Sequence, residues 1–208
     1  MAKKKKPKPE SWYGQIWWFL WHDDSALSWV VNIVLAVILI KFIIYPGLGL
    51  ILDTNFPVVA VVSGSMDHHG DNLDEWWSEN KAFYLSQGIT KDMFEEYPFS
   101  NGFNKGDLMV LVGIEPDEIE KGMVVVFMGG KNYPIIHRVV VLEEDHLETK
   151  GDANKLQFTP QTDPDHILDE TNISYNAIVG KAVIRIPILG WIKIIFSIVL
   201  GWFGLSIG

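Results

Sequence analysis

The sequence contains no cysteine among its 208 residues. A thiol nucleophile, a disulfide framework and a zinc site built on thiolate ligands are therefore excluded. Positive charge is also scarce, because 17 lysines and arginines stand against 26 aspartates and glutamates, for a formal net charge of −9. Nucleic-acid binding relies on clustered positive charge, so this balance argues against a nucleic acid as the partner of the central domain.

Long apolar runs are missing from the middle of the chain and occur only at its two ends. The first run, within residues 27–51, is long enough to cross the hydrocarbon layer, which takes about 20 residues. It is too long, and begins too far from the N-terminus, for a cleaved signal peptide, so we expect a transmembrane anchor. Five lysines crowd the first ten residues. They predict a cytoplasmic N-terminus and a central domain on the opposite side.

The flanking segments complete the predicted organisation. Residues 1–10 form a basic cytoplasmic tail, and the tryptophan-rich residues 11–26 predict an aromatic helix at the membrane interface. Residues 186–208 form a second apolar segment, interrupted by Pro187 and Lys193, which we expect to be a C-terminal membrane segment.

The central domain, residues 52–185, is predicted to be mainly β. Its apolar runs are short, rich in β-branched residues and separated by Gly, Pro, Asn and Asp. Such a series predicts a coiled antiparallel sheet or small barrel. The expected strands are 57–63, 107–113, 123–128, 134–142, 146–150 and 177–186.

Residues 68–104 interrupt this pattern as an acidic helical insert. The periodicity is helical over 73–97, with Thr90 as an expected N-cap. From Asp67 to Lys105 the chain carries eight acids against three lysines. The insert could cap a cleft, contact a protein translocation channel or decorate the fold.

Three residues of the central domain have side chains that could together perform acyl transfer. Ser65 follows the first predicted strand, His137 lies inside an apolar strand, and Asp152 lies in a Lys-Gly-Asp turn. A serine needs a base to remove its proton, and a carboxylate can fix the tautomer of an imidazole base. Taken singly, each also has a simpler explanation, as a turn serine, a packed histidine and a turn-forming aspartate.

Two further motifs have less specific meanings. His68 and His69 lie beside Asp67 and could suggest a metal site, but adjacent residues of an extended chain point to opposite sides. We therefore expect no metal there. The triplet Asn172-Ile173-Ser174 is a glycosylation sequon, which fits an external domain.

The order of several segments gives the chain a resemblance to the type I signal peptidases of the archaeal and endoplasmic-reticulum kind. The matching segments follow an N-terminal anchor, as in that family, and cover most of the chain apart from the tail and the insert. They are SGSM (63–66), KGDLMVL (105–111), GMVVVF (122–127), HRVV (137–140), TKGDAN (149–154) and GKAVIRIPILGW (180–191).

The resemblance implies roles for the residues of these segments. Ser65 would be the nucleophile, and the Ser63 hydroxyl and the Ser65 N–H would form the oxyanion hole. His137 stands where the bacterial branch has a lysine base, which marks the archaeal and eukaryotic branch. Asp152 matches the Gly-Asp box of the family.

The resemblance also implies a second aspartate, but here the spacing departs from the family. The next acids after the Gly-Asp box are Asp163 and Asp165, and we expect Asp163 to be the counterpart. If neither approaches His137, Asp152 alone must orient the base. The substrate is expected to bind as an added β-strand. The residues expected to line it are Val61, Val62, Met66 and Ile136.

The function implied is that of a membrane-anchored serine endopeptidase that removes signal peptides from secreted preproteins. No metal or organic cofactor is required. The expected partners are preproteins, the lipid bilayer and the translocation channel. An archaeal plasma membrane is favoured over an endoplasmic reticulum. Two alternatives are a catalytically silent, membrane-anchored binding module of the secretion machinery and an unrelated membrane scaffold that binds partners through its acidic insert.

Overall fold

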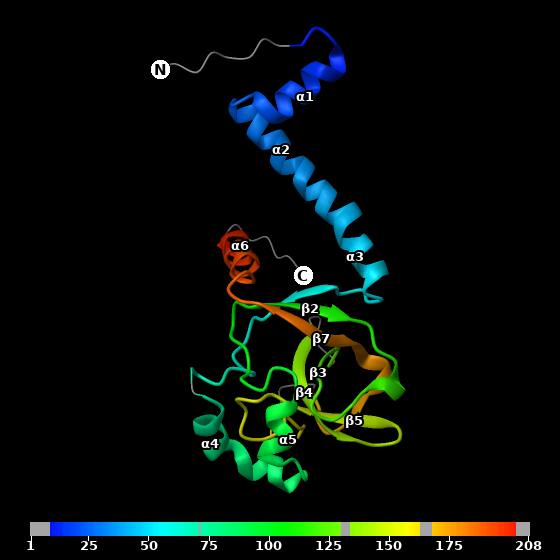
Figure 1. The fold of residues 1–208 in the computed structure, drawn as a ribbon, viewed down its shortest axis with the longest axis vertical. Coiled ribbons are helices and arrows are strands. Elements are labelled where there is room, and N and C mark those ends of the chain that lie inside the picture. The colour runs from blue at the N-terminus through cyan, green and yellow to red at the C-terminus, as the bar shows by residue number, and fades with distance from the viewer. Residues whose placement is uncertain (1–8, 71, 130–133, 163–167, 203–208) are drawn as a thin grey trace. The chain divides into compact units, whose positions relative to one another are not determined.

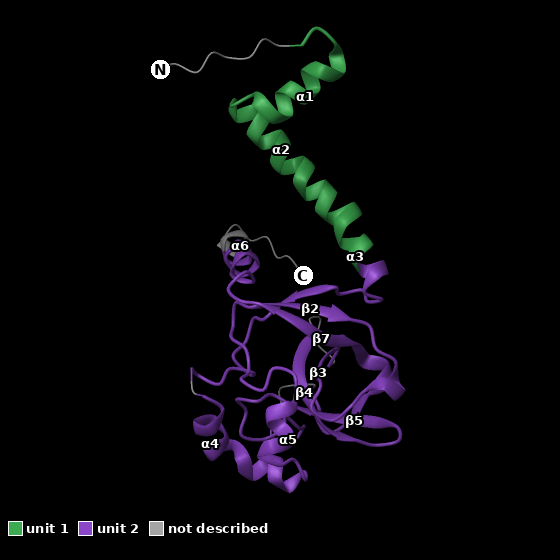
Figure 2. Ribbon diagram, viewed as in Figure 1, with its two compact units in different colours: residues 1–48 green, residues 49–208 purple. Residues whose placement is uncertain are grey.

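A computed structural model describes residues 9–70, 72–129, 134–162 and 168–202. The chain divides into two compact units, residues 1–48 and residues 49–208 (Figure 2). The first unit is helical, and the second holds the sheet and the insert. Every residue of the predicted acyl-transfer site belongs to the second unit.

The first unit is a helical hairpin that is closed by side-chain hydrogen bonds. Helix α1 (Trp12–His22) is followed by α2 (Ala26–Leu39). The Ser28 hydroxyl and the Asn32 amide of α2 donate to backbone carbonyls in the last turn of α1, at 2.7 and 2.9 Å. These carbonyls have no partner inside their own helix, so α2 acts as a C-terminal cap for α1. The hydrogen bond also explains a polar Asn32 within an apolar helix.

One long helical run follows from α2. A π-helical turn (Ile40–Ile44) continues α2 into α3 (Tyr45–Ile51). The combined run, Ala26–Ile51, has 26 residues, and an 18-residue window within it has a mean hydropathy of 2.6 and few buried residues. At 1.5 Å per residue it is about 39 Å long, enough to cross a bilayer core. Among the described residues it is the one helix with the length and composition of a membrane span.

The second unit is built on a curled antiparallel sheet of seven strands in the order β1-β2-β7-β3-β4-β5-β6 (Figure 1). The mainly β fold expected from the sequence is confirmed, and each of the six expected runs contains one strand. The additional strand, β6, has two residues. The bounds are β1 (Val58–Ala60), β2 (Leu108–Val112), β3 (Val124–Phe127), β4 (Ile135–Leu142), β5 (His146–Lys150), β6 (Ile173–Ser174) and β7 (Ile178–Ile186), with single 3-10 turns at Pro116–Glu118 and Tyr175–Ala177.

Strand β3 shows why the sheet curls around its own core. All four of its residues are buried. Val124 and Val126 pack into one apolar cluster, with residues of β2 and β7, whereas Val125 and Phe127 pack into a second cluster with residues of β4 and β5. Because successive strand residues point to opposite faces, both faces of the sheet are covered by the protein itself at β3.

The insert forms two helices, as its periodicity predicted. Helix α4 (Leu73–Ser86) begins at Asn72, which forms a capping box with Glu75. Helix α5 (Lys91–Glu96) begins at Thr90, the predicted N-cap.

The C-terminal helix lies at the opposite end of this unit from the insert helices (Figure 1). This helix, α6 (Trp191–Trp202), has 12 residues. A helix of this length extends about 18 Å, shorter than a bilayer core. A membrane segment at 186–208 stays a prediction.

Candidate active site

The nucleophile candidate lies in a tight turn that follows β1. The Asp67 N–H donates to the Gly64 carbonyl at 3.0 Å, which closes the turn around Ser65. The Met66 side chain is fully buried in the core and fixes the turn to the sheet. The Ser65 side chain is thereby left half-buried at the edge of the core, with its hydroxyl toward β4.

The base candidate meets this hydroxyl directly. His137 lies on β4 and is buried. Its Nε2 is 3.0 Å from Ser65 Oγ, within hydrogen-bond reach. The fold thus brings together two residues that are 72 positions apart in the chain.

The other ring nitrogen of His137 faces a carboxylate that the sequence analysis did not identify. Nδ1 lies 2.5 Å from Oε1 of Glu170, a fully buried residue. The Phe158 N–H donates to Glu170 Oε2 at 2.7 Å and the Thr149 hydroxyl donates to Oε1 at 3.3 Å. A carboxylate that accepts these bonds also accepts from His137, so Nδ1 carries the imidazole proton and Nε2 is free to accept from Ser65.

Sheet pairing explains how Glu170 reaches this position. Strand β6 pairs with β5, and the ladder extends beyond β6 through a hydrogen bond from the Thr149 N–H to the Glu170 carbonyl at 2.9 Å. Thr149 in turn pairs with Val139 of β4, the strand of His137. The local sequence around Glu170, Leu-Asp-Glu-Thr-Asn, is polar, and many surface segments share such a pattern.

Asp152 is not brought to His137. Its carboxylate accepts two hydrogen bonds from the Arg138 guanidinium, at 2.9 and 2.6 Å, and one from the Tyr84 hydroxyl at 3.0 Å. His68 Nε2 lies 3.2 Å away. Burial alone would raise the pKa of the Asp152 carboxyl, but Arg138 and His68 outweigh this and hold that pKa well below its usual range. Asp152 is therefore an ionised structural anchor behind the reacting pair.

The remaining predicted site residues fall into three groups. Asp163 and Asp165 lie outside the described residues. Val61 and Met66 are buried in the core, where their side chains do not face solvent. Val62 is 55% exposed, and Ile136 is half-buried against the same core. Binding of substrate by these residues stays a prediction.

The predicted oxyanion residues lie beside the nucleophile. Ser63 Oγ is 3.2 Å from Ser65 Oγ. In the described part of the chain the Ser65 N–H donates to no protein acceptor. Both groups are thus placed where they could hold an oxyanion, although such a role stays a prediction.

A buried lysine, Lys150, follows Thr149 on β5. Burial lowers the pKa of its amine to about 8. Its Nζ donates to the Gly151 carbonyl at 3.0 Å and lies 3.4 Å from the Asp152 carbonyl. Within the described residues no hydrogen bond joins it to Ser65, so the geometry favours a histidine base over the lysine base of the bacterial branch.

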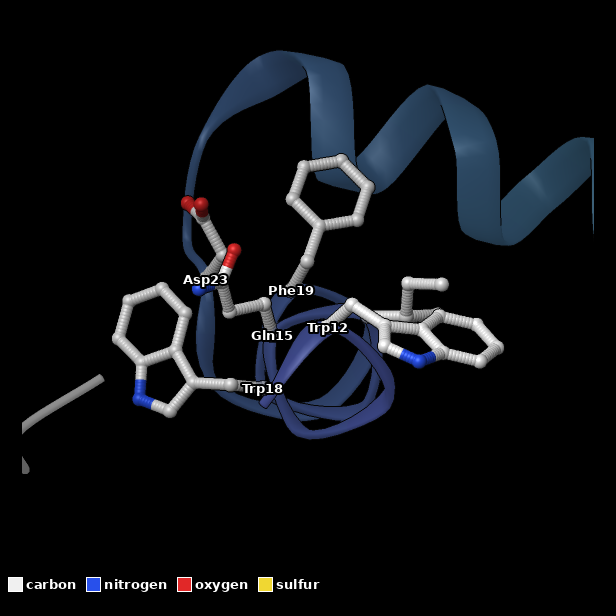
Figure 3. Close-up of a pocket in the computed structure, with 6 residues that line it drawn as sticks. Trp12, Gln15, Trp18, Phe19 and Asp23 are labelled. Atoms are coloured by element: carbon white, nitrogen blue, oxygen red, sulfur yellow. The ribbon is translucent and has the colours of Figure 1, made fainter. Parts of the chain in front are cut away.

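The two adjacent histidines have different environments, since His68 is buried and His69 is exposed. Among the described residues no group of three or more His, Asp or Glu side chains is arranged to hold a metal ion. A hollow at α1 is lined by six residues, of which three are aromatic and none is serine or histidine (Figure 3). Its lining residues are Trp12, Gln15, Ile16, Trp18, Phe19 and Asp23.

Comparison with known proteins gives relatives over most of the chain, whereas no family model matches it. The chain is 28% identical over 179 residues to the signal peptidase complex catalytic subunit SEC11 of Colletotrichum graminicola, covering 83% of this chain and 82% of the relative. The Schizosaccharomyces pombe subunit sec11 is 28% identical, with 82% of each chain covered. The dog subunit SEC11C is 27% identical, over 74% of this chain and 64% of its own length.

These relatives correct one expectation and confirm another. They are fungal and mammalian proteins, which points to the endoplasmic reticulum, so the expectation of an archaeal plasma membrane was wrong. That expectation rested on the apolar segments at both ends of the chain together with the C-terminal segment GKAVIRIPILGW. Eukaryotic relatives nevertheless match the chain over most of its length. The family resemblance inferred from the sequence motifs is confirmed: over most of its length the chain is similar to Sec11 catalytic subunits, which are type I signal peptidases of the endoplasmic-reticulum kind.

Proposed function

We propose that this protein removes signal peptides from preproteins by serine acyl transfer, with Ser65 as nucleophile, His137 as general base and Glu170 as the residue that orients the base. The observation that carries the proposal is the continuous chain of contacts from Ser65 Oγ through the His137 ring to Glu170. Homology to named catalytic subunits of the signal peptidase complex supports the same activity.

The proposed mechanism routes the proton along these contacts. The Ser65 hydroxyl donates to His137 Nε2, which takes the proton as Oγ attacks the carbonyl carbon of the scissile bond. The resulting imidazolium is stabilised by Glu170. His137 then gives the proton to the amine of the mature protein as the peptide bond breaks. The signal peptide remains bound to Ser65 as an acyl-enzyme. Water, deprotonated by His137, attacks the acyl-enzyme. The bond to Ser65 Oγ then breaks, His137 returns the proton to Oγ, and the signal peptide leaves with a free carboxylate.

The oxyanion of each tetrahedral intermediate would be held by the Ser63 hydroxyl and the Ser65 N–H. Donors that are fixed before the reaction begins stabilise developing charge at no cost of reorganisation. Within the described residues, strand β1 lies at the edge of the sheet and has β2 as its one partner strand. Its open edge could accept the substrate as an added strand that ends beside Ser65.

The cellular setting follows from the relatives and from the anchor. The relatives' names describe catalytic subunits of a complex, so we propose that this chain also works within a signal peptidase complex. The run Ala26–Ile51 would cross the endoplasmic-reticulum membrane, with the lysine tail in the cytoplasm and the catalytic unit in the lumen. The translocation channel remains a proposed partner.

The test is cleavage of a preprotein by the purified full chain in detergent, beside a Ser65→Ala variant. We expect the wild type to release a mature protein whose new N-terminus lies directly after the signal peptide. Cleavage at other positions, or equal cleavage by the wild type and the Ser65→Ala variant, would contradict the proposal. If neither protein cleaves the preprotein in detergent, the assay is repeated in membranes that also contain the other subunits of a signal peptidase complex. A wild type that is inactive there as well would contradict the proposal.

The sequon at Asn172 provides a test of the proposed topology. Asn172 and Ser174 are exposed, whereas the intervening Ile173 is buried. A luminal catalytic unit is expected to carry one glycan at Asn172 when expressed in yeast, seen as a mobility shift that an endoglycosidase removes. Asn172→Gln should abolish the shift and Ser174→Thr should retain it. An unshifted, membrane-integrated protein would contradict luminal exposure of this turn.

A further inference from the structure

The helical insert packs on the strand that carries the base. Trp76, Tyr84 and Phe94 are buried, and they form an aromatic cluster with Val140 of β4. Their rings contact one another at centroid distances of 4.9 to 5.5 Å. Such aromatic packing fixes α4 and α5 against the sheet.

The same three aromatic residues also contact the polar groups around Asp152. The Tyr84 hydroxyl donates to Asp152 Oδ1 at 3.0 Å. The Trp76 ring stacks on the His68 ring at 4.0 Å with an interplanar angle of 3°. The Phe94 ring lies 4.6 Å from the Arg138 guanidinium. Each side chain that surrounds the Asp152 carboxylate is therefore supplied or held by the insert.

The Asp152 segment in turn contacts both reacting residues. The Ala153 N–H donates to the Ser65 carbonyl at 2.8 Å, and the Asp152 N–H points to the Met66 sulfur at 3.3 Å. Gly151 is packed so closely that a Cβ there would lie 2.8 Å from the Ser65 carbonyl oxygen and 3.0 Å from His137 Nε2. A shift of this segment would therefore move Ser65 or His137.

We propose that Tyr84 is a positioning residue for the acyl-transfer site, and that the insert fixes the nucleophile turn through the Tyr84 hydroxyl and Asp152. This inference rests on the proposed function. It assigns the insert a role in catalysis rather than decoration.

The chemistry of Tyr84 suits this role. Burial, together with the nearby Asp152 charge, raises the pKa of the Tyr84 hydroxyl well above its usual value. The hydroxyl therefore stays protonated and continues to donate at neutral and mildly alkaline pH. Because a hydrogen bond to an ionised carboxylate is stronger than one between neutral groups, it restrains Asp152 effectively.

The test is Tyr84→Phe, which removes the hydroxyl and retains the ring. The matched control is Tyr175→Phe, because the Tyr175 hydroxyl likewise donates one hydrogen bond, at 2.7 Å to the Glu143 carbonyl, on the exposed surface. Both variants are compared with wild type for kcat and KM on a preprotein, well below their unfolding temperatures. A second readout is the rate at which a fluorophosphonate labels Ser65, measured by mass spectrometry.

We expect Tyr84→Phe to lower kcat and the labelling rate on the order of tenfold with KM unchanged, because small misplacements of reacting groups reduce rates steeply. Tyr175→Phe should match wild type. Equal kcat and labelling in the two variants, or a rise in KM alone, would overturn the proposal. Failure of the proposed function would instead appear as a wild type that cleaves no preprotein, and the labelling rates would still decide the role of Tyr84.

Discussion

Alanine at Ser65 or at His137 is expected to lower kcat for signal-peptide cleavage roughly a million-fold, and glutamine at Glu170 roughly ten-thousand-fold. The Ser65 and His137 variants lose the nucleophile or the base. Glu170→Gln acts differently. Its amide can donate to His137 Nδ1, which moves the imidazole proton to Nε2 and leaves no acceptor for the Ser65 hydroxyl. Single-turnover cleavage at substrate saturation measures these effects on the chemical step.

Two further variants control for the Glu170 result. Glu148→Gln makes the same change in a half-buried side chain of β5 that accepts from Gln157, and it should leave kcat unchanged. Glu170→Asp keeps the charge but shortens the side chain by one methylene, so an intermediate rate is expected. If Glu170→Gln cleaved as fast as Glu148→Gln while Asp152→Asn lost activity with an intact fold, Asp152 and not Glu170 would orient the base.

Methionine at Arg138 is expected to destabilise the catalytic unit by about 3–5 kcal/mol, because the change leaves a buried carboxylate without its counter-ion. Arg138 is fully buried. Besides two bonds to Asp152, its guanidinium donates to the backbone carbonyls of Pro98, Phe99 and Gly122, at 2.8 to 3.0 Å. Those carbonyls also lose their donor in the variant. Denaturant unfolding of the detergent-solubilised chain, followed by tryptophan fluorescence, measures the difference.

The control for this change is Arg185→Met. Arg185 also pairs with an aspartate, Asp107, at 2.6 Å, but its side chain is 30% exposed. Asp107 is itself buried, but its carboxylate keeps the N–H donors of Asn104 and Ile188, at 2.9 and 3.1 Å. A smaller loss of about 1 kcal/mol is therefore expected, because these donors remain and solvent reaches the Arg185 side chain. Equal losses in the two variants would contradict the importance assigned to the Arg138 and Asp152 pair.

The pH dependence of the Arg138 effect follows from Asp152. Folding holds the pKa of this carboxyl below its ordinary value of 3.8. Its contribution to stability is therefore complete above that value, and it is lost as the pH falls toward the lower pKa of the folded state. The difference between wild type and Arg138→Met should accordingly shrink in acid.

The insert shows how a sequence pattern can give the structure of a segment without its role. Its two helices and the N-cap at Thr90 follow from local periodicity and capping chemistry. The contact of Tyr84 with Asp152 joins residues 68 positions apart. No local pattern distinguishes this tyrosine from one that packs on a surface.

The sequence by itself determined the class of this protein: a long apolar helix near the N-terminus, a mainly β domain, and a serine and histidine in the segment order of the family. These features depend on composition, on periodicity and on motifs of adjacent residues. Only the tertiary structure decided that Glu170 contacts His137 and that Asp152 pairs with Arg138. Arg138 follows His137 on β4, so its side chain lies on the opposite face of the strand and draws Asp152 away from the base. Glu170 reaches His137 through the pairing of β6 with β5 and of β5 with β4, and such long-range pairing leaves no trace in the residues themselves.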